Sequence, residues 1–417
     1  MRVRRMLLGV SMLLVALALV LGGWLWRKAG PKPGEAPAGA PIVIGLLQAL
    51  TGSLATSERP LVAAVELAVK EINDEGGLLG RRVELRIEDT RSAAADTAPS
   101  AAARLIDEQQ AAALFGCWSS GCRQAVRSVV EPRRHLFFYP MAHEGMEKSA
   151  HIIYTGATPN QQALPAAGWA MAQFGRRVYL VGTEGVFPRR VNAMLRDFVQ
   201  LSGGQVLGER YVPRASVDVA GIVADLRALK PDLVLSTVGG DVSRAFFDAL
   251  VAADLTQQPL LSLTAAEPEM RAYGGGRLAR HFVAWGYLQS LPGAENAAFL
   301  ARLRANGGAD VQASDPAVSA YVAVKLWAAA VREVGTAQTE LVNQAVLQQS
   351  VSAPHGFTAV DAQTRHVWRP LRVARVQPGG QLEEVWQASR YIRPAPWPTF
   401  RSTQHWAALA AASGGAR

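Results

Sequence analysis

Two serines follow an apolar run that stops at a glycine, in the stretch 114–123 (LFGCWSSGCR). Residues 112–115 predict a buried strand and residues 123–134 a helix, so Ser119 and Ser120 fall where the helix begins. Unpaired backbone N–H groups and the positive end of the helix dipole face outward there, which suits an acceptor oxygen on a small molecule. A serine that only caps the helix is the alternative interpretation.

Hydroxyl, carboxylate and aromatic side chains recur in the loops at the ends of predicted strands. Such groups donate and accept hydrogen bonds, and in a cleft between two lobes they suit a small, neutral polar solute. Each single residue could equally cap a helix or be an ordinary surface group, so it is the recurrence that favours binding. The candidates are Trp118, Ser119, Ser120, Tyr139, Tyr154, Thr183, Glu184 and Glu267.

The chain lacks the motifs of several common enzyme classes. It has no Walker A sequence, no G-x-S-x-G elbow and no HExxH, and its seven histidines include no i,i+4 pair. Glu144 and Glu147 could share a helical face as acid and base, but solvated carboxylates are the simpler interpretation. We therefore expect no catalytic residue, no metal ligand and no cofactor.

The elements that must position these residues alternate between strand and helix. After residue 160 the pattern restarts, which indicates a second lobe, and each alternating half implies a parallel sheet covered on both faces with ligand loops at the carboxyl ends of its strands. A hairpin-like tail with its turn at 378–380 follows. The predicted strands are 42–47, 83–87, 112–115, 136–140, 152–156, 178–181 and 233–237.

The length and charge fit this organisation. A chain of 417 residues that is 49% hydrophobic is long enough for two lobes. The formal net charge is +9, but residues 1–41 hold six basic residues and one acidic residue, and the remainder carries only +4. Lysine and arginine are dispersed along it, so we expect no nucleic-acid partner.

The first 41 residues predict export. Residues 6–26 are 21 residues without a charge, between three arginines and Arg27-Lys28, which is long enough for a membrane helix whose N-terminus stays in the cytoplasm. A cleaved signal peptide is the alternative, with Ala38-Gly39-Ala40 as its only good cleavage site, followed by a proline. Residues 27–41 read as a Pro/Gly/Ala linker and residues 401–417 as a tail.

Cys117 and Cys122 are the only cysteines, too few for a disulfide framework or a four-ligand zinc site. In an oxidising compartment they could pair and close a small ring around the serines. A strand-to-helix turn could also hold them apart. The sequence leaves both alternatives open.

Six segments of the chain resemble, in order, the type I periplasmic solute-binding proteins, and within them the branch that binds urea and short-chain amides. The first segment is shared across the type I binders, and the segments at 115–120, 138–145, 154–162 and 186–189 are more specific to this branch. The segments are 71–81 (EINDEGGLLGR), 115–120 (FGCWSS), 138–145 (which contains FYP and EG), 154–162 (which contains YTGA and PNQQ), 186–189 (VFPR) and 393–398 (RPAPWP).

This resemblance, over residues 42–400, implies an α/β fold of two lobes that close on a ligand, each lobe a parallel sheet flanked by helices. The uncharged run over residues 6–26 predicts a membrane helix that precedes this fold. Three crossovers between the lobes make each lobe discontinuous in sequence. The implied first lobe is about 42–158 plus 290–352, and the second is about 159–289 plus 353–400.

Residue by residue, Ser120 and Tyr139 match ligand-contacting positions of the amide binders, and Trp118 matches or replaces an aromatic. Other candidate positions depart from the branch. Gly185 stands where an aromatic residue is usual, Met141 where the amide branch has threonine, and Gly239 where the urea branch tends to have asparagine. These departures enlarge the implied pocket and remove hydrogen-bond partners, so a larger amide or a different small solute is expected.

The resemblance implies a periplasmic receptor for an ABC importer of urea or related amides, with permease subunits as partners. The apolar run over residues 6–26 predicts a tether to the inner membrane. A membrane-anchored ligand sensor that acts through a partner protein is the alternative. A third interpretation is that the altered loops bind nothing and the chain is a structural partner in a membrane complex.

Overall fold

The computed structural model describes residues 39–412 apart from residues 93 and 215. The predicted anchor over residues 6–26 and nearly all of the linker over 27–41 lie outside the described residues. Within the described ranges, no helix is both long and apolar enough to cross a membrane.

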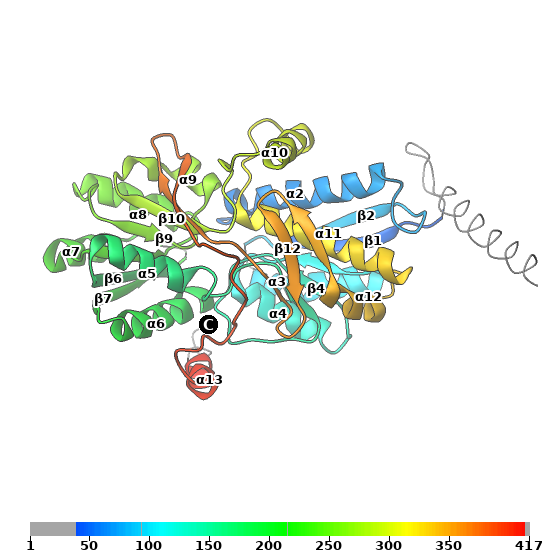
Figure 1. Ribbon diagram of the computed structural model, residues 1–417, viewed down its shortest axis with the longest axis horizontal. Coiled ribbons are helices and arrows are strands. Elements are labelled where there is room, and N and C mark those ends of the chain that lie inside the picture. The colour runs from blue at the N-terminus through cyan, green and yellow to red at the C-terminus, as the bar shows by residue number, and fades with distance from the viewer. Residues whose placement is uncertain (1–38, 93, 215, 413–417) are drawn as a thin grey trace, which may run out of the picture.

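Two lobes lie side by side, each built on one sheet (Figure 1). The first lobe contains an eight-stranded sheet in which β1 to β5 run parallel, while β12 pairs antiparallel with β11 and β13. The central strands β1, β3, β4 and β5 are largely apolar and almost wholly buried because helices cover both faces of the sheet there. In spatial order they are β11 (Ser350–Ala353), β12 (Gly356–Asp361), β13 (His366–Val367), β5 (Ile152–Tyr154), β4 (Phe137–Tyr139), β3 (Leu114–Gly116), β1 (Ile42–Gln48) and β2 (Val83–Asp89).

The helices of the first lobe pack on both faces of this sheet. Buried apolar side chains of two long helices form much of its core, and Phe115 on β3 stacks on Phe138 of β4 with ring centroids 4.8 Å apart. The helices are α2 (Ala55–Asp74), α3 (Ala94–Ala103) with a π-helical turn at Arg104–Glu108, α4 (Ser120–Val130), α10 (Ala294–Gly307), α11 (Asp315–Val334) and α12 (Thr339–Ala345) with a 3-10 turn at Val346–Gln348.

The second lobe contains a seven-stranded sheet with a parallel centre and an antiparallel edge formed by β14 and β15. These two strands are the hairpin that the sequence predicts, so that prediction is confirmed. The strands in spatial order are β15 (Leu382–Gln387), β14 (Arg372–Val376), β10 (His281–Trp285), β9 (Leu260–Ser262), β8 (Leu233–Thr237), β6 (Arg177–Thr183) and β7 (Gln205–Val212). The helices are α5 (Ala163–Phe174), α6 (Val186–Leu201), α7 (Ala220–Leu229), α8 (Val242–Ala252), α9 (Glu267–Tyr273) with a 3-10 turn at Gly275–Arg277, and α13 (Thr403–Ala412).

Three segments cross between the lobes, as the resemblance implies: 155–162, 286–293 and 368–371. The third crossover differs in position from the implied boundary at residue 353. The strands β12 and β13 pair in the first sheet, and Val360 and Val367 lie in the first lobe's core, so the chain passes to the second lobe only after Val367.

The predicted tail is partly a packed helix. Within α13, Trp406 is completely buried and its Nε1 donates to the carbonyl of Pro398 at 2.7 Å. Figure 1 shows α13 beside α6 of the second lobe, which agrees with the hydrogen bond from Arg190 of α6 to the carbonyl of Ala410 at 2.9 Å.

Candidate functional site

A cleft of about 990 Å³ lies between the lobes, at the carboxyl ends of the parallel strands in both sheets. Both lobes contribute to its lining in comparable measure. From the first lobe come Leu54, Ser92, Asp96, Trp118, Ser119, Ser120, Gly121, Gln124, Met141 and Ala142, and from the second come Thr183, Glu184, Gly185, Val186, Phe187, Pro188, Pro213, Arg214, Thr237, Gly239, Leu263, Thr264 and Trp285.

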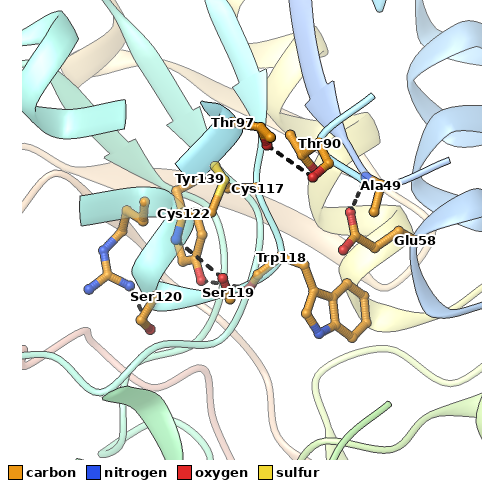
Figure 2. Close-up of a disulfide and its surroundings, with 11 residues drawn as sticks. Ala49, Glu58, Thr90, Thr97, Cys117, Trp118, Ser119, Ser120, Cys122 and Tyr139 are labelled. Carbon is orange, nitrogen blue, oxygen red and sulfur yellow. Dashed lines mark hydrogen bonds between the residues drawn. A yellow bond between two sulfur atoms is a disulfide. The ribbon is translucent and has the colours of Figure 1, made fainter. Parts of the chain in front are cut away.

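The loop between β3 and α4 forms one wall of this cleft. Cys117 and Cys122 are joined by a disulfide, which settles the alternative that the sequence leaves open. Ser119 caps α4 by accepting the N–H of Cys122 at 3.2 Å (Figure 2). The capping interpretation is therefore confirmed, and the same loop also lines the cleft. In Figure 2 the Trp118 indole points away from the disulfide, on the side of Glu58.

The hydroxyl of Ser120 is already used inside the protein. It donates to Glu144 at 2.6 Å and accepts from Arg123 at 3.0 Å. Ser120 lines the cleft, but one donated and one accepted hydrogen bond leave its oxygen a single free lone pair. Its backbone, at the first turn of α4 where N–H groups lack intrahelical acceptors, is the better contact for a ligand oxygen.

Glu144 and Glu147 are buried, so the prediction that they are solvated is wrong. Arg123, which has no exposed surface, donates to Glu144 at 2.9 Å and to Glu147 at 3.0 Å. Burial raises the pKa of Glu147, but Arg123 and the hydroxyl of Tyr154 lower it more, to about 2. Arg190 of the second lobe also reaches Glu144 at 3.4 Å, so this cluster joins the lobes beneath the cleft.

Three of the candidate residues do not line the cleft. Tyr139 and Tyr154 are completely buried, and their hydroxyls donate to the carbonyl of Trp118 at 2.9 Å and to Glu147 at 2.7 Å. Both rings are enclosed because both faces of β4 and β5 are covered, so a side chain on either face is buried. Glu267 is buried on α9, where it accepts the N–H of Gln289 at 2.7 Å, and burial raises its pKa to about 8.

Glu184 lies in the cleft, but its carboxylate is bound by Arg189 through two hydrogen bonds of 2.7 and 2.9 Å. The guanidinium of Arg189 also stacks over the ring of Tyr211. The ion pair compensates the charge of Glu184 but leaves lone pairs on its carboxylate, so its role as an acceptor for ligand N–H groups stays a prediction.

The space beside Gly185 is not empty. Gly185 has a φ of 152°, and a Cβ atom there would lie 2.9 Å from Nη2 of Arg214. The missing side chain thus makes room for a guanidinium and does not simply enlarge the pocket. Sequence reasoning misses Arg214, because it follows β7 in a polar stretch with no pattern that distinguishes it from a surface arginine.

The rest of the cleft combines the hydroxyl residues Thr183, Thr237 and Thr264 with apolar side chains. Met141 and Gly239, two departures from the amide branch, both line it. The nearest atom to a Cβ at Gly239 would be 3.8 Å away on Thr264, so this corner is open. Apolar surface comes mainly from Trp118 and Phe187 with a small part of Met141, whereas Leu263 and Trp285 border the cleft but are buried. Among the residues that the structure describes, no group of histidine, cysteine, aspartate or glutamate could hold a metal ion.

Residues 42–403 match the family model described as a periplasmic binding protein domain. A curated relative from Brucella abortus (strain 2308), the Leu/Ile/Val-binding protein homolog 7, is 29% identical over 225 residues, which are 50% of this chain and 55% of the relative. Homolog 8 from the same strain is 25% identical over 213 residues. The chain thus spans about half the length of the curated relatives it matches.

Solved structures share the fold across most of the chain. A solute-binding protein of an ABC transporter from Rhodopseudomonas palustris HaA2, in complex with p-hydroxybenzoic acid, has a TM-score of 0.77 at 20% identity and covers 86% of this chain and 99% of its own. A solute-binding protein of an ABC transporter from Rhodopseudomonas palustris BisB5, in complex with 3,4-dihydroxybenzoic acid, has a TM-score of 0.76 at 19% identity and covers 85% of this chain and 98% of its own. LivJ from Streptococcus pneumoniae, in complex with isoleucine, has a TM-score of 0.73 at 17% identity, covering 84% and 100%.

Proposed function

Because this chain belongs to the periplasmic binding protein domain family, we propose that it is an extracytoplasmic receptor that captures a small solute between its lobes and delivers it to the permease of an ABC-type importer. The observation that carries the proposal is the cleft itself. Loops from both sheets line it, with the first turn of α4 on one side and the 183–188 loop on the other.

A ligand in this cleft touches both lobes only when they are closed. That difference in contact is the free energy with which a ligand shifts the population toward the closed state. The three crossover segments allow this motion without unfolding either sheet. Closure is also what a permease would recognise in a loaded receptor.

The ligand class is tested with small acids and with the neutral solutes that the amide-branch resemblance implies. The similar structures hold p-hydroxybenzoic acid, 3,4-dihydroxybenzoic acid and isoleucine. The full chain, purified in a mild detergent, is heated with each of these three and with urea and acetamide. A ligand at 100 times its dissociation constant stabilises by about 2.7 kcal/mol, which raises the melting temperature by several degrees.

A variant that fills the cleft shows where the ligand binds. Gly239→Trp places an indole in the open corner beside Thr264, so it should abolish the thermal shift. Ala305→Trp, on the exposed face of α10, is the matched control and should leave the shift unchanged. A ligand that stabilises Gly239→Trp as much as the natural chain would place the site elsewhere, and no shift with any compound would contradict the proposal.

Import and sensing are separated in cells. Deleting the gene should reduce uptake of the ligand that binds. Unchanged uptake, with altered expression of other genes, would favour the sensor that acts through a partner protein. The tether through residues 6–26 belongs to the proposal, and a soluble periplasmic product shortened by about 40 residues would contradict it.

A further inference from the structure

We propose that Arg214 is the specificity-determining residue of the cleft and that it binds the carboxylate of the ligand. This inference rests on the proposed function and names the ligand class, a small monocarboxylate with an apolar body. It replaces the neutral amide that the sequence predicts.

Arg214 lines the cleft without a partner. It makes no hydrogen bond and no ion pair with any residue that the structure describes. A guanidinium offers five N–H donors in a planar fork that matches a carboxylate. Most other arginines near the cleft are already engaged, since Arg123 and Arg190 bind Glu144, and Arg189 binds Glu184.

The backbone at Gly185 leaves room for the guanidinium of Arg214. The φ of 152° at Gly185 lies in the region that favours glycine, and a Cβ atom there would meet Nη2 of Arg214 at 2.9 Å. Gly185 and Arg214 come from neighbouring loops, after β6 and β7, whose strands pair in parallel. A side chain at position 185 would displace the group that we assign to the ligand.

The acidic groups near Arg214 do not neutralise its charge. Glu58 of the opposite lobe is within electrostatic reach of it, but burial raises the pKa of Glu58 to about 8, even though the N–H of Ala49 donates to it at 2.6 Å. The Glu58 carboxyl is therefore mostly neutral at pH 7. Glu184 is held by Arg189, and Asp96 is exposed to water where the cleft opens.

The side chains around Arg214 favour a ligand with an apolar body. Beside the cation, the cleft presents the partly exposed side chains of Trp118 and Phe187 and a small part of Met141. Such a surface binds a ring or a branched aliphatic chain, while one charged donor fixes its orientation. A molecule as small and polar as urea would leave this apolar surface and the guanidinium unmatched.

The experiment compares acids with their isosteric amides, which differ in charge and hardly in shape. The pairs are benzoate and benzamide, p-hydroxybenzoate and its amide, and isoleucine and isoleucinamide. Affinities are measured by calorimetry for the full chain and for Arg214→Gln, Arg214→Lys and the control Arg390→Gln, an exposed arginine outside the cleft. An acid should bind at least about 30-fold more tightly than its amide, because a charge-assisted bidentate pair is lost.

The variants test the residue itself. Arg214→Gln should lower acid affinity by about 30-fold or more and reduce the preference over the amide, Arg214→Lys should retain part of both, and Arg390→Gln should change neither. Gly185→Ala should weaken acid binding independently, because its Cβ displaces the guanidinium.

The outcomes separate the two proposals. An amide that binds as tightly as its acid, or an acid whose affinity is unchanged in Arg214→Gln, overturns the role of Arg214 and leaves the receptor function intact. A chain that binds none of the six compounds, and neither urea nor acetamide, contradicts the receptor function and this inference together.

Discussion

Asp315 and Arg369 form a buried ion pair whose hydrogen bonds reach all three segments that cross between the lobes. Asp315 accepts the N–H of Tyr287 in the second crossover at 2.8 Å. Arg369 lies in the third crossover and donates to the carbonyl of Thr155 in the first. It also donates to Ser319 of α11 at 2.8 Å. The crossovers are thus tied to one another and to the first lobe, so closure must bend them on the side of the second lobe.

Replacing Asp315 with asparagine should destabilise the chain strongly. The variant keeps the shape but leaves the Arg369 guanidinium buried without its counter-charge, which costs about 3 kcal/mol or more. Urea unfolding measures the change in the free energy of unfolding. Glu340→Gln, which breaks an exposed ion pair with Arg134, is the matched control and should cost less than about 1 kcal/mol. Equal losses in the two variants would show that the buried Asp315–Arg369 pair stabilises the chain no more than the exposed pair does.

Much of the fold could be predicted because it depends on local periodicity. Apolar runs such as 42–47 and 233–237 predict strands, and their alternation with helices predicts parallel sheets with loops at one edge. The loop positions that follow such strands, Ser119, Glu184 and Gly239 among them, lie in the cleft as expected. Position along a strand is enough to place a loop at the correct end of a sheet.

What the sequence could not predict depends on contacts between distant residues. Tyr139 and Tyr154 stand at strand ends, but only the packing shows that their rings turn into the core. The pairing of Glu144 with Arg123 joins residues 21 apart, and in isolation a carboxylate reads as a surface group. Arg214 becomes notable only when Gly185 is seen beside it.

The disulfide between Cys117 and Cys122 should stabilise the chain modestly. It closes a ring with a sequence separation of 5, and so short a loop restricts the unfolded chain by about 2 kcal/mol. The double variant Cys117→Ser, Cys122→Ser should lose this amount in urea unfolding. Because the chain has only these 2 cysteines, a reductant should destabilise the natural chain and leave the variant unchanged. A reductant that affects both equally would contradict the prediction.

Two stacked histidines should make stability depend on pH. Nδ1 of His143 accepts the N–H of Gly145 at 3.2 Å, while Nδ1 of His366 lies 2.6 Å from the carbonyl of Thr364 and must donate to it. The two Nε2 atoms are 3.0 Å apart, so His143 donates to His366 and both rings are neutral. Protonating either ring removes an acceptor nitrogen and so breaks this series of hydrogen bonds. Burial, with Arg123 adding to it, lowers the pKa of His143 to about 3, and burial also lowers that of His366.

Since both pKa values are lower in the folded chain, the stability that the pair contributes is present above pH 6.5 and is lost as pH falls from 6.5 toward 3. Each histidine costs about 1.4 kcal/mol per pH unit in that window. The double variant His143→Gln, His366→Gln should therefore lose less stability than the natural chain between pH 6.5 and 5. Urea unfolding at several pH values measures the two slopes, and parallel slopes would show that the pair does not titrate on unfolding.

The C-terminal helix α13 should depend on Trp406. The indole is completely buried, stacks edge-on with Phe400 at 5.1 Å between centroids, and donates to Pro398. Trp406→Ala removes a large apolar side chain from this contact, which costs about 3 kcal/mol. Arg190 and the contact between His405 and Asp197 also join α13 to α6, and we expect the loss of the indole to release the helix locally before the lobes unfold. Limited proteolysis should then cut the variant near residue 400 while the natural chain resists. Gln404→Ala, which shortens an exposed side chain of the same helix, should leave the chain resistant, and equal resistance of Trp406→Ala would mean that other contacts hold α13 in place.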